Sequence, residues 1–189
     1  MATAPIDTIT DPAAINEFWF SARVRPLWFN STAVFDAELI AHYQTTWEAA
    51  RSGRLASWES TPAGALALVI VLDQLPLNMF RGTAQGFATE QAAREVAARA
   101  IERGDDQALD HAGRAFLYLP FMHSEDLVDQ DRSVALFEAA GLLENLRFAR
   151  HHREIIQRFG RFPHRNAILG RPSTPGELAY LSSPQAFHG

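Results

Sequence analysis

Residues 158–166, with the sequence RFGRFPHRN, concentrate three arginines and one histidine within nine positions. A guanidinium group binds carboxylate and phosphate oxygens through paired N–H donors, so such a cluster suits an anionic group. We expect Gly160 to end the preceding helix and Pro163 to fix the turn that follows. The polar side chains left on this turn are those of Arg161, His164, Arg165 and Asn166. They predict either a site for an anionic ligand or ion pairs with acidic side chains of the same chain.

The stretch HSEDLVDQD carries a second polar cluster. Ser124 suits the start of a helix, and Glu125 and Asp129 are four residues apart, which places them on one helical face. Together with His123 they could bind a divalent metal, or His123 and Glu125 could act as a catalytic acid and base. No spacing here matches an established metal motif, so we expect no metal and no other cofactor. Gln130 is a candidate ligand-binding residue.

Asp73 follows ten mostly apolar residues, AGALALVIVL, near the expected C-terminal end of a helix. The helix dipole disfavours a carboxylate at that end, and a buried carboxylate needs a charged or donor partner. Arg81, or an arginine of the basic C-terminal segment, could supply it. The alternatives are a buried ion pair that locks this helix to the C-terminal segment, and one wall of a binding pocket.

Two adjacent histidines fall on opposite faces of the helix predicted from about Leu142 to Phe159. At 100° per residue, His151 lies on the polar face with the arginines, whereas His152 lies in the middle of the apolar face. We expect His151 to be a surface residue. His152 is predicted to be either a core histidine hydrogen-bonded to one neighbour or a functional acid, base or ligand.

Charge is distributed unevenly along the chain. The formal net charge is −5, and all 17 basic residues are arginine. The segment Arg147–Arg171 contains seven arginines and a single acid, Glu154, so the remaining chain carries about −11. Asymmetry of this kind indicates a basic face for an anion, or a basic segment that docks on acidic neighbours. Cysteine is absent, which excludes disulfides, cysteine nucleophiles and thiolate metal sites.

Nearly every segment has the apolar spacing of a helix, and no alternating β pattern stands out. The sequence therefore predicts an all-α fold of antiparallel helical pairs. Thr61 is expected to open a central buried helix that Pro76 ends. Asp106 is expected to begin a later helix that Pro120 ends, and Ser124 to cap the helix after it.

The chain is expected to form a single all-helical domain, residues 1–189, because no linker or low-complexity stretch divides it. The N-terminal MATAPIDTIT lacks the basic and apolar regions of a signal peptide, and the apolar run ALALVIVL is too short to span a bilayer. We therefore expect a cytoplasmic protein with no membrane partner. Nucleic acid is not an expected partner either, because the chain is acidic, the basic patch is short and no recognition motif is present.

Several of these stretches together resemble a known family. The order FWF, LDQLP, RGTAQGFA, YLPFMHSEDLVDQ and HREIIQRFGRFPHRNAILGR is similar to the bacterial proteins grouped as domain of unknown function 924, over roughly residues 15–182. The resemblance implies a tetratricopeptide-like, right-handed array of about eight helices with degenerate repeats. It implies no reaction, because the family is uncharacterised.

The family pattern marks residues in each polar cluster. They are Asp73, Gln74, Asn78, Arg81, His123, Ser124, Glu125, Gln130, His152, Arg161, His164, Arg165 and Asn166. The chain departs from the pattern at Leu77, where the family usually has an arginine. If that arginine contacts a ligand, this chain binds a different ligand or binds it less tightly.

Two functions are compatible with these residues. In the first, a phosphate- or carboxylate-bearing small molecule binds in a polar cleft and meets acid–base groups. Its arginines would be Arg81, Arg161 and Arg165, and its acid–base residues His123, Glu125 and His152. This function predicts a pocket that contains at least two unpaired arginines. In the second, the chain is a scaffold that binds a protein or peptide, its polar clusters are paired internally, and an open groove is lined by arginines and aromatic residues. The oligomeric state stays open, and a dimer is compatible with either function.

Overall fold

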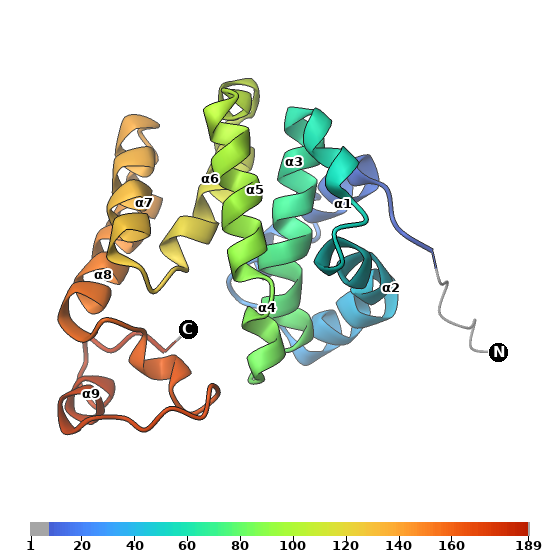
Figure 1. Ribbon diagram of the computed structural model, residues 1–189. Coiled ribbons are helices and arrows are strands. Elements are labelled where there is room, and N and C mark those ends of the chain that lie inside the picture. Colours follow the sequence, from blue (N-terminus) through green and yellow to red (C-terminus); the bar gives the residue numbers. More distant parts are fainter. Residues whose placement is uncertain (1–7, 189) are drawn as a thin grey trace. The chain divides into compact units, whose positions relative to one another are not determined.

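The computed structural model describes residues 8–188, and within this range it contains helices and no strands, as the all-α prediction requires. Most of the N-terminal stretch MATAPIDTIT lies outside the described residues. Short 3₁₀ turns connect several of the helices (Figure 1). The α-helices are α1 (Pro12–Trp19), α2 (Ala33–Arg51), α3 (Pro62–Val69), α4 (Leu75–Met79), α5 (Glu90–Glu102), α6 (His111–Met122), α7 (Leu127–Ala139), α8 (Leu143–Phe159) and α9 (Pro175–Leu181). The tetratricopeptide-like arrangement stays a prediction.

The chain divides into two compact units. The first comprises the residues up to Arg81 together with Gln85–Pro120, and the second comprises Gly82–Ala84 together with the residues from Phe121 onward. The first unit therefore contains α1 to α5 and most of α6, and the second contains α7 to α9. The expectation of a single domain stays a prediction.

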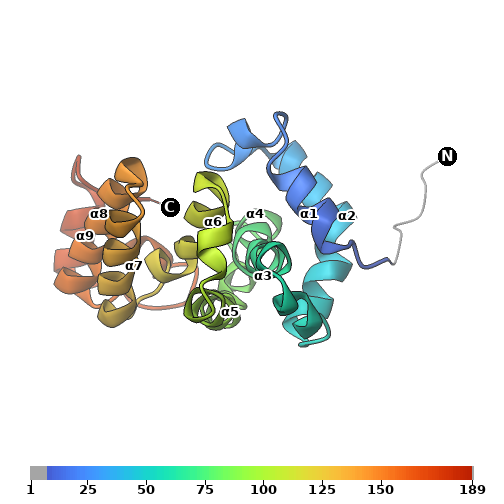
Figure 2. The ribbon, with the colours of Figure 1, turned by 90° about the horizontal axis from the view of Figure 1, so that it is seen from above.

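The first unit is built around α3, whose residues Gly64–Val69 are all buried. Helices α1 and α5 pack against α3, and α2 packs against α4 (Figure 2). Pro62–Met79 is the one segment of the described chain that is long and apolar enough to cross a membrane, with a mean hydropathy of 1.4. It is 83% buried inside the structure, which is the environment of a core helix in a soluble domain.

Pro76 does not end the central helix, so that prediction is wrong. Ile70–Gln74 form a π-helical turn that joins α3 to α4. Proline lacks an N–H group and its ring crowds the carbonyl four residues earlier, which here belongs to Leu72. The Leu72 carbonyl instead accepts a hydrogen bond from the Thr89 hydroxyl at 2.5 Å. The π turn and this hydroxyl let the helix continue past Pro76 to Met79.

Three other helix boundaries differ from the prediction. Asp106 lies in a 3₁₀ turn and accepts a hydrogen bond from the Tyr118 hydroxyl at 2.6 Å, while α6 begins later, at His111. Pro120 lies inside α6, which continues to Met122. Ser124 is not the cap of α7. Asp126 caps it by accepting from the Val128 N–H at 2.7 Å.

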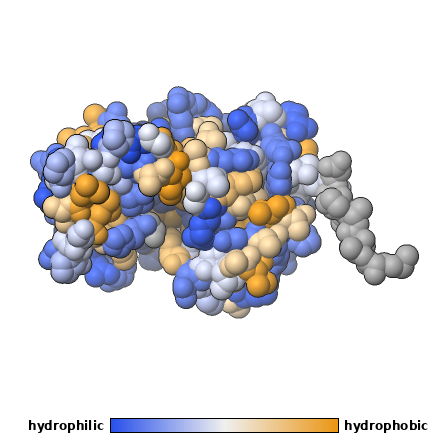
Figure 3. Space-filling view, turned by 90° about the horizontal axis from the view of Figure 1, so that it is seen from below, coloured by the Kyte–Doolittle hydropathy of each residue, from blue (hydrophilic) through white to orange (hydrophobic). Residues whose placement is uncertain are grey.

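The second unit begins with α7 and α8, which lie side by side and are joined by a turn at Gly141 with φ +66° (Figures 1 and 2). Most of the predicted apolar face of α8 is buried, and its buried residues are Leu146, Ala149, His152, Ile155 and Ile156. Phe148, which the periodicity also places on this face, is exposed instead. Gly160 ends α8 in the left-handed conformation, as predicted. Seen from the side shown in Figure 3, the surface is mostly hydrophilic, and its apolar residues form small separate groups.

Candidate functional site

Arg161 of the RFGRFPHRN stretch is paired with a carboxylate of its own unit. Its Nε and Nη2 atoms donate to the two carboxylate oxygens of Glu177 at 2.6 and 2.9 Å. Glu177 is buried, and it also accepts from the Thr174 N–H at 2.7 Å in the capping box of α9. The hydrogen bonds from Arg161 are the main reason why the pKa of Glu177 falls to about 2. This pair fastens the end of α8 to the start of α9.

Glu125 takes part in a second paired contact of the same kind. Arg171 donates to both carboxylate oxygens of Glu125 at 2.6 and 2.9 Å, and the Phe162 N–H donates to the same carboxylate at 2.8 Å. Burial by itself would raise the pKa of Glu125, but these hydrogen bonds outweigh burial and lower it. Asn166 is buried and accepts from the Arg171 Nε at 3.1 Å. We call the Arg161–Glu177 and Arg171–Glu125 pairs the arginine clamp.

The cluster around Asp73 lies in the first unit, in the π turn and in α4. Asp73 is fully buried and accepts from the Gln74 side-chain amide at 2.6 Å. Asn78, also buried, donates to the Gln74 carbonyl at 3.0 Å and accepts from Arg81 at 2.7 Å. The guanidinium of Arg81 pairs with Asp36, with Nε to oxygen at 2.9 Å.

Gln130 has a position that explains it structurally. Its side chain is fully buried and donates to the backbone carbonyls of Met122 and Ser124, each at 2.7 Å. The last carbonyls of a helix lack donors within the helix, so this amide satisfies the end of α6. Ser124 in turn donates to Asp129 at 2.7 Å. His123 lies in the turn between α6 and α7, close enough that its charge contributes to lowering the pKa of His152.

His152 and His164 are neutral at physiological pH. Burial is the main cause that lowers the pKa of His152 to about 3, with smaller effects from His123, His151 and His164. Its Nδ1 donates to the Phe148 carbonyl at 2.9 Å, which fixes Nε2 as the acceptor of the neutral ring. His152 is therefore buried with one backbone hydrogen-bond partner, the geometry that the core-histidine alternative predicts.

His164 lies in the 3₁₀ turn Pro163–Arg165, and burial followed by the charge of Arg165 lowers its pKa to about 4. Glu125 raises this pKa, whereas His188 and Arg171 lower it further. Its Nδ1 atom is buried and has no hydrogen-bond partner among the described residues. The neighbouring Arg165 is buried, with its guanidinium carbon 4.7 Å from the centre of the Phe162 ring.

One aromatic side chain from the C-terminal tail, residues 184–188, lies against both neutral histidines. The ring centre of Phe187 is 4.4 Å from that of His152 and 5.1 Å from that of His164, both in edge-to-face geometry. The ring of Phe162 is 5.4 Å from His152 and 5.6 Å from His164. We call the group of His152, Phe162 and His164 the histidine–phenylalanine pocket. It contains no carboxylate, and no cluster of three or more His, Cys, Asp or Glu that could hold a metal occurs in residues 8–188.

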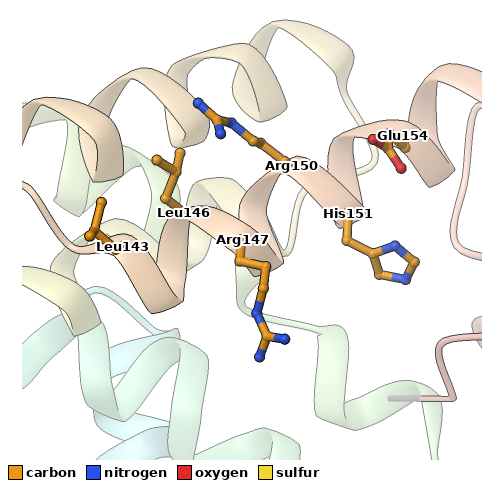
Figure 4. A pocket seen from close by; sticks show the side chains of 6 residues that line it. All are labelled: Leu143, Leu146, Arg147, Arg150, His151 and Glu154. Carbon is orange, nitrogen blue, oxygen red and sulfur yellow. The ribbon is translucent and has the colours of Figure 1, made fainter.

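A separate open depression of about 400 Å³ lies on the exposed side of α8. Its lining residues are Leu143, Leu146, Arg147, Arg150, His151 and Glu154. Arg147 and His151 point to one side of the helix and Arg150 to the other (Figure 4). None of the site residues predicted from the sequence lines it. His151 connects the two features, because its ring is also 6.4 Å from that of Phe187.

Comparison with known proteins identifies the family of this chain. Residues 15–185 match the model of the family described as bacterial protein of unknown function, DUF924. The chain belongs to this family. A solved structure titled as a protein of unknown function, ATU0120, from Agrobacterium tumefaciens is 43% identical to this DUF924 chain, with a TM-score of 0.86. The similarity covers 90% of this chain and 96% of the Agrobacterium chain. No curated protein matches this DUF924 chain.

Several residues that matter in this DUF924 chain were not among the predicted site residues. Glu177 was detectable, because the TPGE stretch has the spacing of a capping box, but its pairing with Arg161 needs the fold. Arg171 ends the stretch HREIIQRFGRFPHRNAILGR, yet nothing in the spacing assigns it to Glu125. Phe187 gives no signal in the sequence, because a lone aromatic residue near a terminus has no periodic context.

Proposed function

We propose that this DUF924 protein is a helical scaffold that binds a segment of another protein on the exposed side of α8. The observation that carries the proposal is the internal pairing of two of the three arginines expected to bind an anion. Arg81 pairs with Asp36, and Arg161 pairs with the buried Glu177 through two hydrogen bonds. A small anion would have to displace a carboxylate held nearby by the fold, and that competition disfavours the anion-site alternative.

The arginines of the depression on α8 are held much more weakly. Arg147 pairs with Glu144 at 3.3 Å and Arg150 with Glu138 at 2.7 Å, and more than half of each of these four side chains is exposed. Exposed pairs of this kind stabilise a protein by about 0–1 kcal/mol, so a carboxylate of a partner can replace them at little cost. Leu143 is 71% exposed beside them. The surface therefore suits an acidic peptide segment that also carries an apolar side chain.

A peptide library displayed on phage, selected against the full-length chain at low salt, tests the proposal. We expect enriched peptides that contain Asp or Glu next to Leu, Ile or Phe. Their affinity should fall at least tenfold in the variant Arg147→Glu/Arg150→Glu and should decrease as salt rises.

The matched control is Arg51→Glu/Arg54→Glu, which changes the net charge equally on exposed arginines of the first unit. We expect this control to keep the affinity of the parent chain within about twofold. Selection of peptides with no acidic residues, or equal loss of affinity in both double variants, would contradict the proposal.

A further inference from the structure

We propose that the histidine–phenylalanine pocket is a recognition site for one aromatic side chain of the partner peptide, and that Phe187 of the C-terminal tail occupies this site in its absence. The inference rests on the proposed function in one respect: the aromatic residue belongs to the same peptide that binds the depression on α8. The sequence motifs gave no assignment for Phe187.

The contacts of Phe187 are those of a side chain bound in an aromatic pocket. His152 and His164 meet its ring edge to face at interplanar angles of 62° and 81°, and Phe162 lies against both histidines. Edge-to-face pairs at these ring separations are favourable beyond the area that they bury. The charge-neutral state of both imidazoles keeps the pocket suited to an uncharged ring.

The tail that carries Phe187 is held by few contacts, so it can be displaced. Two backbone hydrogen bonds hold it: the Phe187 N–H donates to the Tyr180 hydroxyl at 2.9 Å, and the Ala186 N–H donates to the Ser183 carbonyl at 3.1 Å. Ala186 and Phe187 are partly buried against the core of the unit, whereas Pro184, Gln185 and His188 are exposed. A segment with this little burial and no helix of its own opens more readily than the helices beneath it.

The pocket also lies next to the proposed peptide surface. His151 lines the depression on α8, and its ring is 6.4 Å from the ring of Phe187. A peptide that follows α8 from Leu143 to His151 therefore reaches the place that Phe187 occupies. An aromatic side chain at that point of the peptide would replace Phe187 ring for ring.

The tail competes with a partner as a tethered ligand. A short tether corresponds to an effective concentration in the millimolar range, so a free peptide binds weakly while Phe187 is present. Removal of Phe187 from the chain should therefore expose the site. The fluorescently labelled peptide SSPQAFHG, which copies residues 182–189, is a direct probe, and SSPQAAHG is its matched control.

Fluorescence anisotropy with the full-length chain is the measurement. We expect SSPQAFHG to bind the variant Phe187→Ala at least tenfold more tightly than the parent chain, and SSPQAAHG to bind neither. The variant Tyr180→Phe removes only the hydroxyl that holds the tail, and we expect it to bind SSPQAFHG with an intermediate affinity. This second variant keeps the test decisive if Phe187→Ala folds poorly.

The inference would be overturned if folded Phe187→Ala and Tyr180→Phe chains did not bind SSPQAFHG, or if both peptides bound equally. It would also be overturned by a concentration-dependent dimer of the parent chain that Phe187→Ala abolishes. The last result would assign the pocket to the tail of a second copy.

Failure of the proposed function can be distinguished from failure of this inference. If Arg147→Glu/Arg150→Glu affects no peptide while SSPQAFHG still binds Phe187→Ala, only the α8 surface is wrong. If acidic peptides bind through α8 but do not respond to Phe187→Ala, only the pocket is wrong.

Discussion

The arginine clamp and the histidine–phenylalanine pocket lie in the same unit and share Phe162, yet they differ in how their contacts are satisfied. In the clamp, each guanidinium donates at least two hydrogen bonds to a carboxylate. Backbone N–H groups donate to the same carboxylates. In the pocket, two neutral imidazoles meet one ring from a lightly held tail. The comparison shows that arginines of the most densely charged stretch stabilise the fold through internal ion pairs. The contact that a partner can replace is instead made between uncharged rings.

The largest expected effect comes from breaking the clamp. Glu177→Gln leaves Arg161 without its anionic partner and weakens the cap of α9, so we expect the free energy of unfolding to fall by about 2–3 kcal/mol. Urea denaturation followed by circular dichroism measures it. Glu144→Gln is the control, because that side chain is 85% exposed, and its effect should stay within about 0.5 kcal/mol. Equal effects of the two substitutions would contradict a structural role for the clamp.

The pocket should give the protein a pH-dependent stability. The pKa of His152 is about 3 in the folded chain and 6.5 when it is unperturbed, so between these values the unfolded chain binds a proton that the folded chain does not. The contribution of neutral His152 to the free energy of unfolding is therefore fully present above pH 6.5. It decreases as the pH falls below 6.5, and at pH 5 the free energy of unfolding is lower by about 2 kcal/mol. His164 acts in the same direction.

Thermal unfolding between pH 7.5 and pH 5 measures this dependence. The variant His152→Phe keeps a ring in the pocket but cannot take up a proton, so its stability should fall less on acidification. The variant His151→Phe makes the same chemical change one residue earlier, on the polar face. Its stability should depend on pH as steeply as that of the parent chain. Identical slopes in His152→Phe and the parent chain would show that another group is responsible.

A smaller effect is expected when the geometry of the clamp changes but its charge does not. Arg171→Lys keeps the positive charge next to Glu125 but cannot make the paired contact and the bond to Asn166 together. We expect a loss of about 1–2 kcal/mol in urea denaturation. Arg147→Lys, in an exposed pair, should change stability by less than about 0.5 kcal/mol. A similar result for both would mean that paired geometry is unimportant at Glu125.

The smallest loss of stability is expected from opening the pocket. Phe187→Ala removes a partly buried ring and should cost about 1 kcal/mol. Its clearer signature is in the histidines, because water that enters the pocket reduces the burial that lowers their pKa values. An NMR titration should show the pKa of His152 rise from about 3, and that of His164 from about 4, toward 6.5. Unchanged values would show that the tail does not cover these rings in solution.

Local patterns were sufficient for much of the fold. The helical periodicity of α8, its end at Gly160 and the buried face that contains His152 follow from the sequence, because they depend on residues within one or two turns of each other. Pro76 shows the limit of this reasoning. Its helix continues because Thr89, thirteen residues later, donates to the Leu72 carbonyl, and no local rule contains that contact.

The candidate site likewise has a part that the sequence predicts and a part that only the fold determines. The sequence by itself determined that Arg161, Glu125 and His152 are unusual, because charge, spacing and an apolar helix face are properties of short stretches. Only the tertiary structure decided their partners. Glu177, Arg171 and Phe187 lie 16, 46 and 35 residues from them along the chain, respectively. An isolated charge or imidazole can be satisfied by any suitable group that the fold brings near it. Whether these residues are fastened inside the protein or left for a partner is therefore set by the packing of the unit, not by their own positions in the sequence.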